Sequence, residues 1–230
     1  MTASGEGVGA ALDAVRARIA AAAARAGRDP AAVTLVAVSK THGPDAVRAA
    51  YARGQRDFGE NYVQELVAKA AELADLADLR WHFIGHLQTN KCRDVAGRVA
   101  MVQSLDSVRL VRELGRRAVA ASRTVGILVQ VNVAREAQKS GCEVGELGSI
   151  LAEAEATPGV ALRGLMTVPP AVPDAAASRP WFEALRALRD EHGGASRLPE
   201  LSMGMTHDMA EAVAAGATMV RVGTAIFGAR

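Results

Sequence analysis

The sequence predicts a single (β/α)8 barrel, a TIM barrel, and three observations support this fold class. The chain has 230 residues, of which 50% are apolar, a size and composition suited to one α/β domain. Eight short apolar runs alternate with longer helical patterns. Several runs are unbroken stretches of Val, Ile and Leu, as expected of parallel strands covered on both faces. No long linker interrupts the alternation, which favours a closed barrel over an open doubly wound sheet.

The expected strands and helices follow one another along the chain. The strands are 33–39, 56–59, 81–85, 101–105, 125–132, 160–166, 200–203 and 219–222. The helical patterns between them include 45–53, 62–74, 107–122, 144–156, 181–192 and 208–215. The Pro- and Ala-rich stretch 169–180 is too short to separate domains. We therefore expect a loop there and one domain over residues 1–230.

Residues 1–30 predict an additional helix that packs on the barrel. Leu12, Val15 and Ile19 recur at helical spacing and define an apolar face. The Ala- and Arg-rich composition of this segment also resembles a targeting peptide, but Asp13 is an acidic residue of a kind such peptides lack. The spacing therefore favours a structural helix.

Charge and cysteine content exclude several function classes. The formal net charge is +2 and the basic residues are dispersed, unlike the clustered basic face of a nucleic-acid-binding protein. No apolar run is long enough to span a membrane. The two cysteines, Cys92 and Cys142, lie far apart and outside any CxxC motif. We expect no disulfide and a reduced, cytoplasmic setting.

Polar residues collect where the predicted strands end, which is where barrels of this type place their active sites. Lys40 follows the first strand directly and is one of only four lysines, because arginine supplies the other basic charges. A lysine amine can form a Schiff base, whereas an arginine cannot. The ordinary alternative is a strand-end lysine that reaches solvent. Lys40 is nevertheless the strongest candidate for a reactive group.

The last two strands carry a second signal. Ser202 and Gly204 end the seventh strand, and Gly223 and Thr224 follow the eighth. Phosphate sites in such barrels commonly form from these two loops, where backbone N–H groups and hydroxyls bind an anion. Turn glycines and a helix-capping threonine are the alternative. Arg221, inside the eighth strand, needs a buried partner, either a carboxylate or the ring nitrogen of a bound pyridine.

The histidines are less informative. His82 and His86 are spaced to lie on one face of the third strand, but no third ligand follows at a useful distance, so we expect no metal. His42 borders the lysine loop, and His207 starts a predicted helix.

Seven ordered motifs, from residue 33 to the end of the chain, carry a family resemblance. They are VAVSKT (36–41), GENY (59–62), WHFIG (81–85) with LQTNK (87–91), VN (131–132), GLM (164–166), LSMGM (201–205) and VRVGTAIFG (220–228). The chain resembles the pyridoxal-phosphate homeostasis proteins, which are relatives of the alanine racemase N-terminal barrel. That resemblance implies a fold-type III barrel that binds pyridoxal 5′-phosphate.

The resemblance also implies roles for individual residues. Lys40 would hold the cofactor as a Schiff base, Asn61 would lie near the ring, and Arg221 would face the pyridine nitrogen. The phosphate would be held by residues of the last two loops: Ser202, Gly204, Gly223 and Thr224. The sequence departs from the family at His86, where proline is usual, at Thr206, where serine is common, and in the loop after Lys40.

The function implied by the resemblance is cofactor handling in the cytoplasm, without robust catalysis. The protein would hold pyridoxal phosphate and supply it to apoenzymes. Related racemases need a second acid–base group, a tyrosine from a separate domain of a partner subunit. This chain has only Tyr51 and Tyr62 and no such domain is expected, which also suggests a monomer.

Two enzymatic alternatives and one transfer hypothesis remain open. A small amino-acid racemase could use His42 or His86 in place of the tyrosine. A Schiff-base aldolase could use Lys40 to attack a phosphorylated sugar. Lys139, in the loop after the fifth strand, could take the cofactor transiently during transfer, although a solvated loop lysine is the simpler interpretation.

Overall fold

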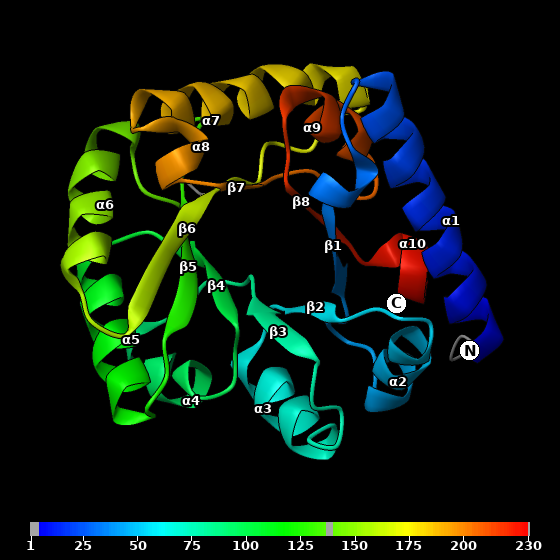
Figure 1. The fold of residues 1–230 in the computed structure, drawn as a ribbon, viewed down its shortest axis with the longest axis horizontal. Helices are drawn as coiled ribbons and strands as arrows, with labels where there is room; N and C mark the ends of the chain where they lie inside the picture. Colours follow the sequence, from blue (N-terminus) through cyan, green and yellow to red (C-terminus); the bar gives the residue numbers. More distant parts are fainter. Residues whose placement is uncertain (1–4, 137–139, 230) are drawn as a thin grey trace.

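The structure, a computed structural model, describes residues 5–136 and 140–229 and confirms the predicted barrel. Eight strands close into a barrel in the order β1-β2-β3-β4-β5-β6-β7-β8, and every neighbouring pair is parallel. Helices surround the strands (Figure 1). This arrangement brings the carboxyl ends of all eight strands to one rim.

The strands lie close to the predicted runs. They are β1 (Thr34–Val38), β2 (Asp57–Glu60), β3 (Arg80–Phe83), β4 (Met101–Leu105), β5 (Val125–Gln130), β6 (Val160–Met166), β7 (Glu200–Ser202) and β8 (Met219–Val222). β3 ends at Phe83, two residues earlier than expected. Residues 84–88 follow it as an irregular segment.

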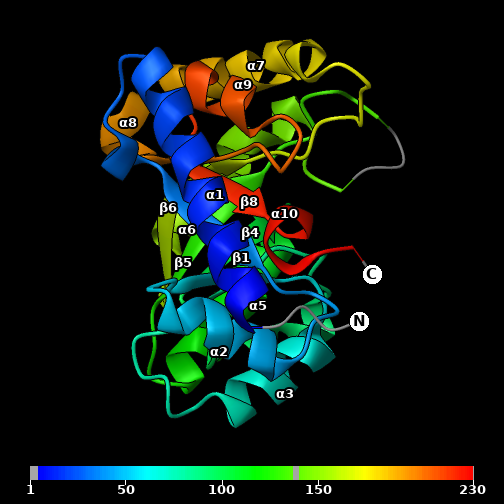
Figure 2. The ribbon, with the colours of Figure 1, turned by 90° about the vertical axis from the view of Figure 1, so that its right-hand side faces the viewer.

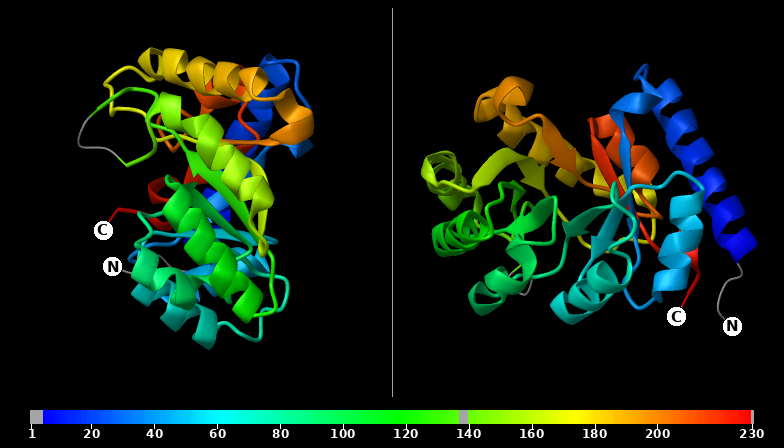
Figure 3. Two further views of the ribbon diagram at one scale, coloured as in Figure 1. Left: turned by 90° about the vertical axis from the view of Figure 1, so that its left-hand side faces the viewer. Right: turned by 60° about the horizontal axis from the view of Figure 1, so that its bottom comes forward.

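The longer helices match the predicted patterns, and several short ones were not predicted. The α-helices are α1 (Gly5–Arg25), α2 (Pro44–Ala52), α3 (Val63–Glu72), α4 (Cys92–Ala96), α5 (Val108–Ala120), α6 (Leu147–Ala156), α7 (Arg179–Glu191), α8 (Gly194–Arg197), α9 (Met209–Ala215) and α10 (Thr224–Phe227). The expected loop 169–180 contains the short 3-10 helix Ala175–Ser178. Figure 3 shows the helices from two further sides. None of the helices among the described residues combines the length and apolar character of a membrane span.

Helix α1 packs along the outside of the barrel, where it contacts α2, α9 and α10 (Figure 2). Leu12, Val15 and Ile19 are buried in this contact. The helix is anchored at its polar edge by Arg16, which donates to the backbone carbonyl of Arg53 at 2.8 Å. It therefore covers the side of the barrel where the first and last strands pair.

Side chains along each strand alternate between two buried environments. One side packs against the helices in a large apolar cluster that includes Trp81 and Phe83. The other side faces the barrel interior. His82, which lies between Trp81 and Phe83 in the sequence, points to this interior and is 3% exposed. A small apolar cluster, with Met101 and Met219 among its members, fills part of this interior. Buried polar groups share the interior, and they connect to the site described next.

Candidate functional site

A cavity of about 730 Å³ opens at the carboxyl ends of the strands. Five of the seven predicted site residues line it: Lys40, Asn61, Arg221, Gly223 and Thr224. They come from segments that are far apart in sequence, and the barrel brings them together. The other two, Ser202 and Gly204, are buried and are not among the lining residues.

Lys40 is half-buried and lies in the turn that leaves β1. The next residue, Thr41, has a φ of 67°, a left-handed conformation that is uncommon for a residue other than glycine. Two hydrogen bonds stabilise this turn. The Thr41 backbone N–H donates to Glu65 Oε2 at 2.7 Å, and the His42 N–H donates to the Ser39 carbonyl at 3.1 Å. The direction of the Lys40 side chain thus depends on a strained but well-held turn.

A buried ionic cluster supports this turn from below. Lys69 Nζ donates to Glu60 Oε1 at 2.7 Å, to Glu65 Oε2 at 3.0 Å and to the Ser39 carbonyl at 2.7 Å. The Ser39 hydroxyl also donates to Glu60 Oε1, at 2.6 Å. Burial raises the pKa of Glu60 and outweighs the lowering effect of Lys69 and Ser39. This cluster was missed in the sequence, because Glu60 ends a strand and Lys69 lies on the following helix, and only the packing of that helix brings the two side chains together.

Asn61 offers an acceptor at the cavity. Its Oδ1 is buried and has no hydrogen-bond partner among the described residues. The backbone of Asn61 lies against Gly85, where an added Cβ would be 2.1 Å from the Asn61 carbonyl oxygen. Only glycine allows this approach. A buried, unpaired acceptor is costly unless a ligand satisfies it, so the position of Asn61 fits a bound polar molecule.

Arg221 places a buried cation at the cavity floor. Its Nη1 donates to Ser202 Oγ at 2.6 Å, and its Nη2 donates to the Thr167 carbonyl at 2.8 Å. Burial lowers the pKa of Arg221 to about 10, and Asp208 acts in the opposite direction. The guanidinium therefore remains charged at neutral pH. Ser202 is fully buried and holds Arg221.

The loops after β7 and β8 contain the glycines and hydroxyls that the sequence predicted to bind an anion. Gly223 precedes helix α10, and a Cβ there would lie 3.0 Å from the Val38 carbonyl oxygen. The first backbone N–H groups of a helical turn have no acceptor within the helix. Thr206, from the loop after β7, lines the same cavity. Gly204 has a φ of 90° and packs closely against Ala212 of α9.

The histidines separate into different environments. His42 and His207 line the cavity. His82 and His86 do not share a strand face as expected, because β3 ends at Phe83. His82 is buried inside the barrel, whereas the His86 side chain is 59% exposed and 4.0 Å from Asp106.

The remaining candidates lie away from the cavity or cannot be placed. Lys139 lies outside the described residues. Tyr51 donates a hydrogen bond to Asp78, and neither Tyr51 nor Tyr62 lines the cavity. Cys92 and Cys142 are both buried as free thiols.

Comparisons with known proteins agree with this architecture. The family model for the alanine racemase N-terminal domain matches residues 10–230. A Pseudomonas aeruginosa protein named pyridoxal phosphate homeostasis protein is 48% identical over 217 residues, covering 94% of this chain and 93% of the relative. An Escherichia coli protein of the same name is 44% identical over 222 residues and covers 94% of each chain.

Solved structures give the same result. PipY of Synechococcus elongatus, with pyridoxal phosphate bound, has a TM-score of 0.84 and 39% identity over 96% of this chain and 100% of its own. Alanine racemase from Corynebacterium glutamicum shares the fold, with a TM-score of 0.65 and 18% identity over 94% of this chain and 60% of its own. By fold and by sequence, this chain belongs to the pyridoxal phosphate homeostasis protein family.

Proposed function

We propose that this protein binds pyridoxal 5′-phosphate in the cavity at the carboxyl ends of the strands and serves in its homeostasis. The observation that carries the proposal is the convergence of Lys40, Arg221 and the Gly223–Thr224 turn on one cavity. A relative with 39% identity over its whole length, PipY, has been solved with this cofactor bound. The amine, the cation and the anion-binding turn match the aldehyde, the ring nitrogen and the phosphate respectively.

Each residue has a distinct task in this proposal. Lys40 attaches the cofactor covalently through Nζ, and Asn61 Oδ1 faces its ring. Gly223 and Thr224 bind the phosphate, together with the β7 loop that contains Gly204. Ser202 is buried beside the cavity and contributes by holding Arg221. We assign the phosphate-binding hydroxyl that was predicted at Ser202 to Thr206, which lines the cavity.

Arg221 limits what chemistry the site supports. Bound pyridoxal phosphate supplies an electron sink for carbanions, and the sink is strongest when its ring nitrogen is protonated. A guanidinium has only N–H donors, so it cannot accept a hydrogen bond from a protonated ring nitrogen, and its charge disfavours a second cation beside it. Arg221 therefore keeps the ring nitrogen unprotonated. Weak carbanion stabilisation fits a carrier of the cofactor better than a robust catalyst.

The carrier role leads to further expectations. We propose that the protein acts as a monomer in the cytoplasm and that apoenzymes requiring pyridoxal phosphate receive the cofactor from it. We further propose that residues 1–230 act as a single domain with α1 as part of it. Gel filtration with light scattering would test the monomer, because a particle larger than one chain would contradict it.

A small amino-acid racemase is the second candidate, favoured by one observation. His42 lines the cavity next to Lys40, where it could serve as a second acid–base group. Incubation of the loaded protein with L-amino acids in deuterated water separates the two functions. Rapid exchange of the α-proton that disappears in His42→Gln would favour the racemase, and slow exchange in both proteins supports the carrier.

The visible absorption spectrum tests cofactor binding. We expect titration of the protein with pyridoxal phosphate to produce a visible band that Lys40→Ala abolishes. Lys91→Ala is a matched control, because Lys91 is not among the cavity-lining residues and should leave the band unchanged. A colourless wild-type protein would contradict the proposal and favour the aldolase alternative, in which Lys40 reacts with a phosphorylated sugar.

A further inference from the structure

A chain of hydrogen bonds runs through the barrel interior from Arg221 to a carboxylate on the opposite side. Arg221 Nη1 lies 2.6 Å from Ser202 Oγ, which lies 2.7 Å from Gln103 Oε1. Gln103 Nε2 lies 3.0 Å from His82 Nδ1, and His82 Nε2 lies 2.9 Å from Asp57 Oδ1. The five side chains come from β8, β7, β4, β3 and β2. They link the cavity floor to the amino-terminal side of the barrel.

The chemistry of each group fixes the direction of every bond in this chain. A guanidinium only donates, so the Ser202 oxygen accepts from Arg221 and its one proton goes to Gln103 Oε1. The Gln103 amide nitrogen then donates, so His82 Nδ1 must be the unprotonated ring nitrogen. His82 consequently carries its proton on Nε2 and donates it to the carboxylate of Asp57. All four hydrogens point away from Arg221 and toward the negative charge.

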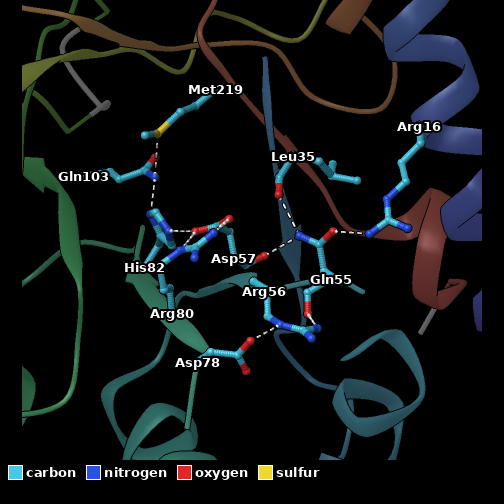
Figure 4. Close-up of polar contacts among 10 residues, drawn as sticks. All are labelled: Arg16, Leu35, Gln55, Arg56, Asp57, Asp78, Arg80, His82, Gln103 and Met219. Carbon is cyan, nitrogen blue, oxygen red and sulfur yellow. Dashed lines mark hydrogen bonds and ion pairs between the residues drawn. The ribbon is translucent and has the colours of Figure 1, made fainter. Parts of the chain in front are cut away.

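The chain is enclosed and anchored at both ends. All five residues are buried, and Ser202 and Gln103 are fully inaccessible. Burial alone would raise the pKa of Asp57, but hydrogen bonds from His82 and Arg80 outweigh it and lower the pKa to about 2. Arg80 holds both carboxylate oxygens, at 2.7 Å and 2.6 Å (Figure 4). The hydrogen-bond chain therefore starts at the buried cation of Arg221 and ends at the ionised, firmly held carboxylate of Asp57.

We propose that Gln103 and His82 are positioning residues that orient Arg221 toward the ring nitrogen of the bound cofactor. The inference rests on the proposed function and adds two residues that do not line the cavity. Arg221 has two described hydrogen bonds, one to the Thr167 carbonyl and one to Ser202. Without Gln103, the Ser202 hydroxyl loses the acceptor that sets its rotation. The Ser202 oxygen is then no longer held in one arrangement, which weakens one of the two contacts that define the plane of the guanidinium.

The first test needs no cofactor. Long-range 1H–15N correlation spectra of the histidine-labelled apoprotein report which ring nitrogen carries the proton, and the His82 signals can be assigned through bonds to its own backbone. We expect a neutral ring protonated at Nε2. A ring protonated at Nδ1 reverses the direction of the Gln103 bond and would overturn the inference.

The second test compares two buried glutamine variants. Gln103→Met removes both amide hydrogen bonds of the chain at nearly constant volume. Gln130→Met removes a buried amide on the neighbouring strand β5, which donates to the Ser140 carbonyl and takes no part in the chain. We expect Gln103→Met to weaken cofactor binding about tenfold, from the usual cost of an unsatisfied buried polar group. It should also shift the pH midpoint of the visible band, which is the pH at which half of the band's absorbance is lost. Gln130→Met should leave the cofactor affinity and this pH midpoint unchanged.

The outcomes separate this inference from the function on which it rests. A wild-type protein without a visible band would overturn both. A wild-type band combined with a Gln103→Met variant that matches Gln130→Met in affinity and pH midpoint would overturn the positioning role alone. If Gln103→Met does not fold, Ser202→Ala tests the same contact. An unchanged pH midpoint in that variant contradicts the inference.

Discussion

Replacing Lys69 with methionine should destabilise the protein by about 3–5 kcal/mol at neutral pH, the usual cost of breaking a buried ion pair. Lys69 is 5% exposed, and its ammonium group is 2.7 Å from a carboxylate, Glu60, that is fully buried. Methionine fills the aliphatic volume but leaves the charge of Glu60 without its partner. For a chain of this length, the loss corresponds to a fall in Tm of roughly 6–20 °C.

The loss should depend on pH in a defined direction. The ordinary pKa of a glutamate is 4.5, and burial already raises the pKa of Glu60. Without Lys69, this folded-state pKa rises further above the unfolded value. An acid with a raised folded-state pKa loses stability as the pH climbs above its unfolded pKa, because only the unfolded chain ionises freely. The destabilisation of Lys69→Met should therefore be small near pH 4.5 and grow toward pH 8.

Urea unfolding followed by circular dichroism measures both effects, provided that wild type and variant are compared at about pH 5 and about pH 8. The double variant Glu60→Gln/Lys69→Met is the matched control. It carries no buried charge at this position and should recover part of the lost stability at pH 8. Equal destabilisation of Lys69→Met at both pH values, or no recovery in the double variant, would refute the assignment of an ionised Glu60.

Three further predictions concern other parts of the molecule. Gly85→Ala should weaken cofactor binding and lower the Tm, because its Cβ would meet the Asn61 carbonyl at 2.1 Å; unchanged calorimetry and titration would contradict the close approach. Asp57 has a pKa of about 2 against an ordinary 3.8, so it contributes about 2 kcal/mol above pH 4 that is lost as the pH falls toward 2. Asp57→Asn should remove that dependence in acid unfolding curves. Cys92 and Cys142 are buried with pKa values near 12, so neither thiol should react with Ellman's reagent until the protein unfolds.

The barrel could be predicted because its strands are buried on both sides. A strand that packs against helices outside and other strands' side chains inside consists mainly of apolar residues, as 125–132 does. The ends of strands were harder to predict where a strand finishes in polar residues. Glu60 was expected just beyond the second strand, but the structure places it within β2, paired with Lys69.

The candidate site was predictable in outline for a geometric reason. Parallel strands end at one rim, so polar residues that follow several strands must meet there. Depth along the barrel axis was not predictable. Ser202 is only four residues from the cavity-lining Thr206, yet it faces the interior and contacts Arg221 and Gln103. Whether a strand residue reaches the cavity or stays beneath its floor depends on the stagger of neighbouring strands, which one sequence does not reveal.

The polar interior could not be predicted for a related reason. Gln103 and His82 sit in apolar runs, and their partners lie on other strands. Only closure of the barrel brings Asp57 and Ser202 to the two ends of that pair. The spacing of His82 and His86 suggested one shared face, but the early end of β3 separates them.

Covalent attachment at Lys40 is the claim most open to direct measurement. The loaded protein should be reduced with borohydride, digested and analysed by mass spectrometry. We predict loss of the visible band, a stable mass increase equal to one reduced cofactor, and its location on the peptide that contains Lys40. A modification found on Lys69, Lys91 or Lys139 instead, or a cofactor that dissociates intact after reduction, would contradict this account of the site.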